Sequence, residues 1–260
     1  MGNELNETKY KIISTLGKGG FATTYLAEKE NKIYALKKYS DITQEETIEL
    51  KKIFEVISTL NNPNIIKYYE SFNEGNSYNI IMEYGGSYNL KKFIQHYSDK
   101  SELIKEKIIY DIIIQICLGL KELHKNKIIH RNLTPNNIIL DKNNKIKIAG
   151  FSVIKVLNPN VNYLKDMVGT LHYLAPEISK GEKYNQKVDI YSLGCILYEL
   201  LTLNEYYVDS VIDEKPITIP EVYNSKWQEI IDSLLNKDYN ARPNIDECII
   251  GIQLIQDEIK

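Results

Sequence analysis

The chain has 260 residues, of which 32 are basic and 35 are acidic, so its formal net charge at pH 7 is −3. This balance excludes the broad basic surface that proteins use to bind nucleic acid or anionic membranes. Hydrophobic residues make up 43% of the chain and charged residues 26%, a composition typical of a folded globular protein and not of a disordered one. The length is sufficient for one large domain or two lobes.

The chain contains three cysteines, Cys117, Cys195 and Cys248, which are too few and too scattered for a disulfide framework or a zinc site. We therefore expect reduced thiols in an intracellular, cytoplasmic protein. The longest apolar stretch, residues 108–120, is interrupted by polar side chains and predicts no membrane span. Residues 1–9 are polar and predict an N-terminal extension without the apolar core of a signal peptide.

Short β-prone runs separated by turns dominate the first third of the chain. A helix is expected among them over residues 44–60, because Ile48, Phe54 and Ile57 lie broadly on one helical face. Gly85-Gly86 ends this pattern and is the best candidate for a hinge. The predicted strands are residues 10–16, 23–28, 32–38, 65–72 and 78–83.

Helical periodicity dominates the remainder of the chain. Residues 101–125 begin with a serine at a capping position and continue with a wide apolar face. Two apolar triplets, 138–140 and 146–148, flank a polar turn and predict a small hairpin. Further helices are predicted over residues 186–201, 225–235 and 245–259.

Together these elements predict the α+β fold class within one domain over residues 10–258. A small β-rich N-lobe with one main helix is expected over about residues 10–83, followed by a hinge at about 83–87. A larger, mostly α-helical C-lobe is expected over about residues 88–258.

The first motif is glycine-rich and lies between two predicted strands, Leu16-Gly17-Lys18-Gly19-Gly20-Phe21-Ala22-Thr23-Thr24. A strand on each side excludes the dinucleotide-binding fingerprint, which runs from a strand into a helix, and favours a lid over phosphates. Alone the signal is weak, because glycine turns join many hairpins. Lys37 follows in Tyr34-Ala35-Leu36-Lys37, where it could reach nucleotide phosphates, although an isolated strand lysine is usually just solvated.

Five later segments follow one another in this order: Ile129-His130-Arg131-Asn132-Leu133-Thr134-Pro135-Asn136-Asn137-Ile138-Ile139-Leu140, Gly150-Phe151-Ser152, Gly169-Thr170 to Ala175-Pro176-Glu177, Asp189-Ile190-Tyr191-Ser192-Leu193-Gly194, and Ala241-Arg242-Pro243. They resemble the motifs of eukaryotic protein kinases of the Ser/Thr type, in which the first would be the catalytic loop and the second the magnesium motif, and the resemblance covers residues 10–259. Pro63-Asn64-Ile65-Ile66 adds a resemblance to the NIMA-related branch.

The resemblance implies a bilobal protein-kinase fold and an ATP site. Leu16, Ala35 and Ile139 would sandwich a purine, and Met82 would form the back wall. Backbone groups of Glu83 and Tyr84 would bind the base. The implied nucleotide-binding residues are Leu16, Gly17, Gly19, Ala22, Thr24, Ala35, Lys37, Met82, Glu83, Tyr84, Asn137 and Ile139.

Three positions depart from the family's catalytic pattern. Asn132 replaces the aspartate that accepts the substrate's proton, and general-base catalysis contributes about 10²–10⁴-fold, or about 3–5 kcal/mol. Gly150 replaces the aspartate that holds magnesium, which leaves Asn137 as the only side chain of the family's metal site. Ile53 stands where a glutamate would pair with Lys37, although Glu49 lies one helical turn earlier.

The residues that support the fold in this family are present. Glu177 and Arg242 match a pair that ties the activation segment to the large lobe, and Asp189 matches a residue that braces the catalytic loop. Arg131 matches the arginine that receives the activation-segment phosphate, but no Ser or Thr hydroxyl lies between Ser152 and Thr170 to carry one.

Three hypotheses follow. The first is a catalytically inactive pseudokinase that acts as a scaffold or allosteric regulator in signalling, with protein partners such as an active kinase or its substrate. It could bind ATP, but without productive Mg²⁺. The second is an unconventional Ser/Thr kinase with residual phosphotransfer. The third is an interaction module that binds no nucleotide, and nothing in the sequence separates it from the first.

Overall fold

The computed structural model describes residues 10–19, 22–141, 143–151, 154–156, 164–206 and 217–259. The chain divides into two compact units, the first made of Met1–Asn61 with Ile66–Ser87 and the second of Asn62–Ile65 with Tyr88–Lys260. The predicted extension at residues 1–9 lies outside the described residues. A first unit built on a sheet and a mostly helical second unit confirm the predicted α+β fold class.

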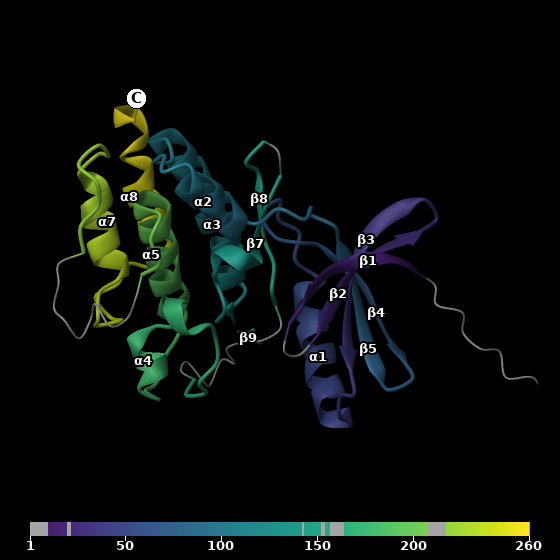
Figure 1. Ribbon diagram of the computed structural model, residues 1–260. Helices are drawn as coiled ribbons and strands as arrows, with labels where there is room; N and C mark the ends of the chain where they lie inside the picture. The colour runs from purple at the N-terminus through teal and green to yellow at the C-terminus, as the bar shows by residue number, and fades with distance from the viewer. Residues whose placement is uncertain are drawn as a thin grey trace, which may run out of the picture. The chain divides into compact units, whose positions relative to one another are not determined.

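The first unit is an antiparallel sheet with strand order β1-β2-β3-β5-β4, accompanied by one helix (Figure 1). All five predicted strands are confirmed, with small shifts at their ends. The elements are β1 (Lys11–Lys18), β2 (Thr23–Lys29), β3 (Lys32–Ser40), α1 (Gln44–Ile57), β4 (Tyr68–Glu74) and β5 (Ser77–Glu83).

Helix α1 begins at a capping box. The Glu46 amide donates to Oγ1 of Thr43 at 3.2 Å, and the Thr43 amide donates to Oε2 of Glu46 at 2.8 Å. The helix ends at Ile57 rather than at the predicted residue 60. The amides of Thr59 and Leu60 donate to carbonyls three residues back, which converts the last turn from α geometry to a tighter one.

The two faces of the sheet carry different sets of side chains, because successive residues of a strand point in opposite directions. Opposite residues in a ladder share a face, so Ala35 of β3 lies beside Met82 of β5, and Lys37 lies beside Thr24 of β2. The other face carries Leu36 and its partner Ile81. Both Leu36 and Ile81 are buried in a cluster that also contains Tyr10 and Ala27.

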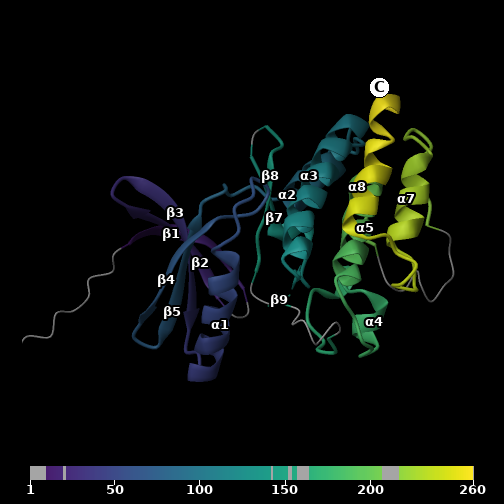
Figure 2. The ribbon, with the colours of Figure 1, turned by 180° about the vertical axis from the view of Figure 1, so that it is seen from behind.

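The second unit is mostly helical (Figure 2). Helix α3 packs against α8, and both views show these two helices side by side. The predicted hairpin is confirmed, with Ile139 opposite Lys147. The elements are α2 (Leu90–Asp99), α3 (Glu106–Lys125), β6 (Ile128–Ile129), β7 (Ile138–Leu140), β8 (Ile146–Ile148), β9 (Lys155–Val156), α4 (Pro176–Ser179), α5 (Lys187–Thr202), α7 (Lys226–Leu234), α8 (Ile245–Gln253), and 3₁₀ turns at Pro135–Asn137, Leu171–Tyr173 and Gln256–Glu258.

Two helical features differ from the sequence prediction. Ser101 does not cap α3: its φ is +52°, and the helix begins at Glu106 without a side-chain cap. Helix α2 was not predicted. It begins at Leu90 and is capped by Asn89, whose side chain accepts a hydrogen bond from the Lys92 amide at 2.9 Å.

The described helices include none that is both long and apolar enough to cross a membrane. Cys117, Cys195 and Cys248 are buried free thiols. Burial raises the pKa of the Cys117 thiol well above its ordinary value, which keeps the side chain protonated and unreactive.

Candidate functional site

Asp189 of α5 holds the loop that follows β6. Its Oδ2 accepts from the His130 amide at 2.9 Å, and its Oδ1 accepts from the Arg131 amide at 2.9 Å. Nε2 of His124 lies 2.9 Å from the same Oδ2. Burial alone would raise the pKa of Asp189, but the hydrogen bond and charge of His124 outweigh it and the pKa is lowered. This anion fixes Arg131 in a left-handed conformation with φ of +63°.

Asn132 and Asn137 are joined by hydrogen bonds within this loop. Nδ2 of Asn137 donates to the Asn132 carbonyl at 2.7 Å. The hydroxyl of Thr170 donates to Oδ1 of Asn132 at 2.7 Å, so the amide oxygen is engaged by the activation segment. An amide at this position accepts a hydrogen bond as a carboxylate would, but it does not take up a proton as a general base.

Asn137 also occupies the space beside Gly150. A Cβ built at Gly150 would lie 2.4 Å from Cγ and 2.5 Å from Oδ1 of Asn137. The φ of Gly150 is +85°, a conformation that strains residues with a Cβ. Within the described ranges, no three His, Cys, Asp or Glu side chains are grouped to hold a metal ion. Of the side chains described beside Gly150, Asn137 offers a neutral amide and no carboxylate.

The sheet of the first unit brings together the predicted nucleotide residues that precede the hinge. Thr24, Ala35, Lys37 and Met82 share one face. The glycine-rich turn is closed by the Gly19 amide, which donates to the Ala22 carbonyl at 2.9 Å, whereas Gly20 and Phe21 lie outside the described residues. The two predicted residues that follow the hinge, Asn137 and Ile139, belong to the second unit.

Leu16 and Gly17 lie at an irregularity in the pairing of β1 with β2, where Leu16 is half-buried. That backbone groups of Glu83 and Tyr84 bind a base stays a prediction. The Glu83 amide donates to the Lys67 carbonyl at 2.8 Å, so this N–H is used inside the unit. Sequence periodicity places a strand but does not show which of its amides are paired.

Lys37 has no carboxylate partner among the residues that the structure describes. Ile53 of α1 is half-buried and Glu49 is exposed, and no ion pair joins Glu49 to the lysine. The ammonium of Lys37 lies 5.3 Å from the centre of the Tyr39 ring. Burial lowers the pKa of Lys37 to about 8, because desolvation disfavours its charged form.

Glu177 and Arg242 form a buried bidentate ion pair in the second unit. The two N–H···O distances are 2.6 Å and 2.8 Å. Nε of Arg242 donates to the Asn236 carbonyl at 2.8 Å, and the guanidinium lies 4.9 Å from the centre of the Tyr191 ring. The ion pair joins α4 to the segment before α8.

Asp166 is the residue that the sequence reasoning missed. Its carboxylate pairs with the guanidinium of Arg131, and it also accepts a hydrogen bond from the Tyr184 hydroxyl at 3.1 Å. The sequence prediction considered only hydroxyl side chains as partners for Arg131. An acidic residue three positions before Gly169 was the available signal, since a carboxylate supplies a permanent negative charge where a phosphate would otherwise add one.

Asp166→Asn is expected to lower the free energy of unfolding at pH 7 by less than about 1 kcal/mol, because the carboxylate is half-exposed. Partial burial alone would raise the pKa of Asp166, but Arg131 outweighs it and the pKa is lowered. The stabilisation is therefore present above the ordinary aspartate pKa of about 3.9 and is lost as the pH falls below it. Urea unfolding at pH 7 and pH 3.5 measures this difference.

The control is Asp99→Asn, at an exposed carboxylate whose hydrogen-bond partner is the neutral amide of Gln95. This variant removes a carboxylate but no ion pair among the described residues, so its free energy of unfolding at pH 7 should stay close to that of the parent chain. An Asp166→Asn deficit that stays constant from pH 7 to pH 3.5 would contradict the assigned ion pair.

Comparison with known proteins gives one consistent family. The profile described as "Protein kinase domain" matches residues 10–250. Serine/threonine-protein kinase Nek11 of Macaca fascicularis is 32% identical over 97% of this chain and 42% of its own length. Serine/threonine-protein kinase Nek1 of Mus musculus is 31% identical over 93% of this chain and 21% of its own. The probable serine/threonine-protein kinase nek2 of Dictyostelium discoideum is 30% identical over 97% and 64%.

The chain thus spans about two fifths of the length of Nek11 and a smaller share of Nek1. The matched residues include both units of the fold and every motif from the glycine-rich turn to Arg242. The chain belongs to the protein kinase domain family, and within it resembles the NIMA-related (Nek) serine/threonine kinases.

Proposed function

We propose that this protein is a pseudokinase, a kinase-fold domain that acts on protein partners by binding and transfers phosphate negligibly. The observation that carries the proposal is the chemistry at two positions of the second unit. Asn132 offers an amide where proton acceptance needs a carboxylate, and Gly150 offers no side chain to a metal ion. Phosphoryl transfer depends on positioning and charge neutralisation, so losing both carboxylates removes the main sources of rate.

The arrangement around Gly150 supports this proposal further. Asn137 turns its amide toward the Asn132 carbonyl and lies against the backbone of Gly150. A carboxylate placed at residue 150 would therefore have to displace it. The loop is packed around the residues now present, and in the described ranges no group of three or more His, Cys, Asp or Glu side chains is placed to hold a metal ion.

A scaffold or an allosteric activator is the role that suits such a domain. The supports of the fold remain: Asp189 holds the loop after β6, and Glu177 with Arg242 anchors α4. Asp166 gives Arg131 a permanent partner that needs no phosphorylation. A surface kept in one arrangement by such contacts is what recognition by a protein partner requires.

Residual Ser/Thr phosphotransfer is the second candidate. It is favoured by the similar proteins, which are named serine/threonine-protein kinases, and by the retained Lys37 and Asn137. It would require an amide and a lysine to position the phosphates without either aspartate. A third candidate is a module that binds no nucleotide.

A thermal-shift titration with ATP tests the nucleotide part of the proposal. We expect the unfolding midpoint to rise by about 5–10 °C at about 100 times the dissociation constant, equally with Mg²⁺ and with a chelator. Phosphate contact would raise the pKa of Lys37 from about 8, so affinity should fall about tenfold between pH 7 and pH 9. Lys37→Met should remove this pH dependence.

A phosphotransfer assay on the same samples separates the candidates. The parent chain should incorporate no more phosphate into a generic protein substrate than Lys37→Met does. Incorporation that needs both Mg²⁺ and Lys37 would overturn the pseudokinase and establish the residual kinase. Absence of any ATP shift in a folded sample would leave the interaction module.

A further inference from the structure

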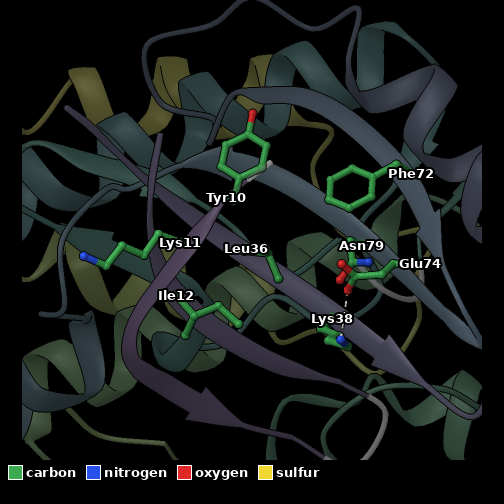
Figure 3. A pocket seen from close by; sticks show the side chains of 8 residues that line it. All are labelled: Tyr10, Lys11, Ile12, Leu36, Lys38, Phe72, Glu74 and Asn79. Carbon is green, nitrogen blue, oxygen red and sulfur yellow. Dashed lines mark hydrogen bonds and ion pairs between the residues drawn. The ribbon is translucent and has the colours of Figure 1, made fainter. Parts of the chain in front are cut away.

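The first unit contains a pocket on the sheet face that does not carry Lys37 (Figure 3). Its volume is about 250 Å³. Leu36 and Lys38 of β3 contribute to it, whereas the nucleotide residues Ala35 and Lys37 project to the opposite face. The pocket is therefore separate from the candidate nucleotide site, although both are built on the same strand.

Asn79 of β5 lines this pocket and is only 1% exposed. Among the residues that the structure describes, neither Nδ2 nor Oδ1 of this side chain has a hydrogen-bond partner. Asn79 lies opposite Lys38 on β3 and opposite Phe72 on β4, which places its side chain on the same face of the sheet as the pocket. Buried polar groups are nearly always paired, so a buried amide that faces a cavity points to a ligand that pairs with it.

The walls of the pocket are apolar and held in place. Tyr10 is buried, its hydroxyl donates to Glu70, and its ring lies 6.3 Å from that of Phe72 at an interplanar angle of 10°. Lys29 lies over the Tyr10 ring, 4.9 Å from its centre. Ile12 adds an aliphatic side chain that is 48% exposed, at the open edge.

The rim carries charge. Nζ of Lys38 lies 3.1 Å from Oε2 of Glu74, and Lys11 adds a second cation from β1. Figure 3 shows the ion pair to one side of the apolar walls, beside Asn79. An apolar slot with one amide inside it and charges at its edge resembles a pocket for the anchor residue of a protein interface.

The size of the pocket decides between a metabolite and a side chain. Small-molecule sites usually enclose about 300–1,000 Å³, so 250 Å³ suits a single aromatic residue better. The amide of Asn79 offers a donor and an acceptor, and a phenolic hydroxyl both donates and accepts. Phenylalanine would leave the amide unpaired, and tryptophan has a donor but no acceptor.

We propose that this pocket binds a tyrosine side chain of a partner polypeptide, with the ring against Tyr10, Phe72 and Leu36 and the hydroxyl on Asn79. The inference does not depend on the proposed function. Every residue that it uses lies in the first unit, whereas Asn132 and Gly150 lie in the second. Failure of one is therefore distinguishable from failure of the other.

Matched probes test the hydroxyl directly. N-acetyl-tyrosinamide and N-acetyl-phenylalaninamide are titrated into the full chain, and the methyl resonances of Ile12 and Leu36 are followed by NMR. The tyrosine probe should bind saturably and at least about tenfold more tightly than the phenylalanine probe, because a site that hydrogen-bonds a hydroxyl rejects the analogue that lacks it. Equal affinities, or no saturation by either probe, would overturn the proposal.

Asn79→Leu should reverse the preference, because an apolar floor favours the phenylalanine probe. Asn73→Leu is the matched control: Asn73 lies opposite Tyr78, on the other face of the sheet, and is exposed. It should leave both affinities unchanged.

Should Asn79→Leu fail to fold, Ile12→Trp fills the pocket from its exposed edge and should abolish binding of the tyrosine probe. Binding that survives Ile12→Trp in a folded protein would place the probe elsewhere and overturn the assignment. Stabilisation by Asn79→Leu without any probe binding to the parent chain would also overturn it, since Asn79 would then be a buried amide with no ligand.

Discussion

Arg242→Met is expected to lower the free energy of unfolding by about 3–5 kcal/mol, and to lower the unfolding midpoint by roughly 6–20 °C. The substitution leaves the carboxylate of Glu177 buried without the two hydrogen bonds that Nη1 and Nη2 of Arg242 donate to it. Both side chains are at most 3% exposed, so water does not replace the lost guanidinium. Urea unfolding followed by circular dichroism measures the difference.

The loss of stability in Arg242→Met comes from the Glu177 carboxylate, which stays buried without a cation, and not from the net contribution of the ion pair. A buried ion pair often contributes little compared with two apolar residues, because desolvation offsets the attraction. Arg242→Met therefore measures the penalty of leaving a buried carboxylate unpaired. The double variant, Arg242→Met with Glu177→Met, removes that carboxylate and should recover part of the lost stability. Arg242 also donates to the Asn236 carbonyl, which sets a limit to that recovery.

Lys226→Met provides the matched control. Lys226 pairs with Glu258, and both side chains are more than 40% exposed, at 43% and 46%. An exposed pair contributes about 0–1 kcal/mol, so the control should unfold almost as the parent does. Equal losses for Arg242→Met and Lys226→Met would contradict the account of a buried, fold-supporting pair.

The fold was predictable from the sequence wherever local patterns determine it. Helix α1 begins where Thr43 and Glu46 form a capping box, and the hairpin of β7 and β8 follows from two apolar triplets around a polar turn. Ser101 misled the prediction for α3 because a serine before an apolar run signals a cap only if its backbone is extended, and here φ is +52°.

The candidate site was predictable as a list of positions but not as a set of contacts. The absence of two carboxylates is visible at Asn132 and Gly150 in the sequence. Asn137 and Gly150 flank the hairpin of β7 and β8, whose register brings its two ends together, but no periodicity shows that the Asn137 side chain occupies the space beside Gly150. The pairing of Asp166 with Arg131 arises from packing between segments that are distant in the chain, and it has no local signature.

Asn79 shows the same limit on the opposite face of the sheet. In the sequence Asn79 is one polar residue within a β-prone run, a pattern that predicts an exposed side chain. The ladder places it between Lys38 and Phe72, where Tyr10 and Leu36 cover the neighbouring surface. Its burial depends on strands β1, β3 and β4 together, which a single segment does not reveal.

The double substitution Asn132→Asp with Gly150→Asp is expected to create phosphotransfer that the parent chain lacks. A carboxylate at residue 132 restores a proton acceptor, and general-base catalysis contributes about 10²–10⁴-fold. A carboxylate at residue 150 supplies an anionic ligand to Mg²⁺, which stabilises charge on the transferred phosphoryl group. Incorporation of labelled phosphate into a generic protein substrate is the measurement.

Each single substitution should give little. Asn132→Asp alone supplies a proton acceptor but no carboxylate ligand for Mg²⁺. Gly150→Asp alone supplies the Mg²⁺ ligand but no proton acceptor. Gly150→Asp should also destabilise the fold, because residue 150 has a positive φ and its Cβ would meet Asn137 at 2.4 Å. Gly150→Ala carries the same backbone strain without a carboxylate, so the comparison of the two separates strain from chemistry.

The gain should disappear when Lys37→Met is added to the double variant, since phosphate positioning is then lost. It should increase when Ile53→Glu is added, because Lys37 has no carboxylate partner within the described residues and a glutamate on α1 would supply one. If the parent chain incorporates phosphate as fast as an active double variant, neither missing aspartate limits the rate, and the pseudokinase proposal would be wrong. A double variant that folds and binds ATP with Mg²⁺ but incorporates no phosphate would contradict this prediction. It would mean that other features, such as the contacts of Asn137 and Asp166, also prevent phosphotransfer.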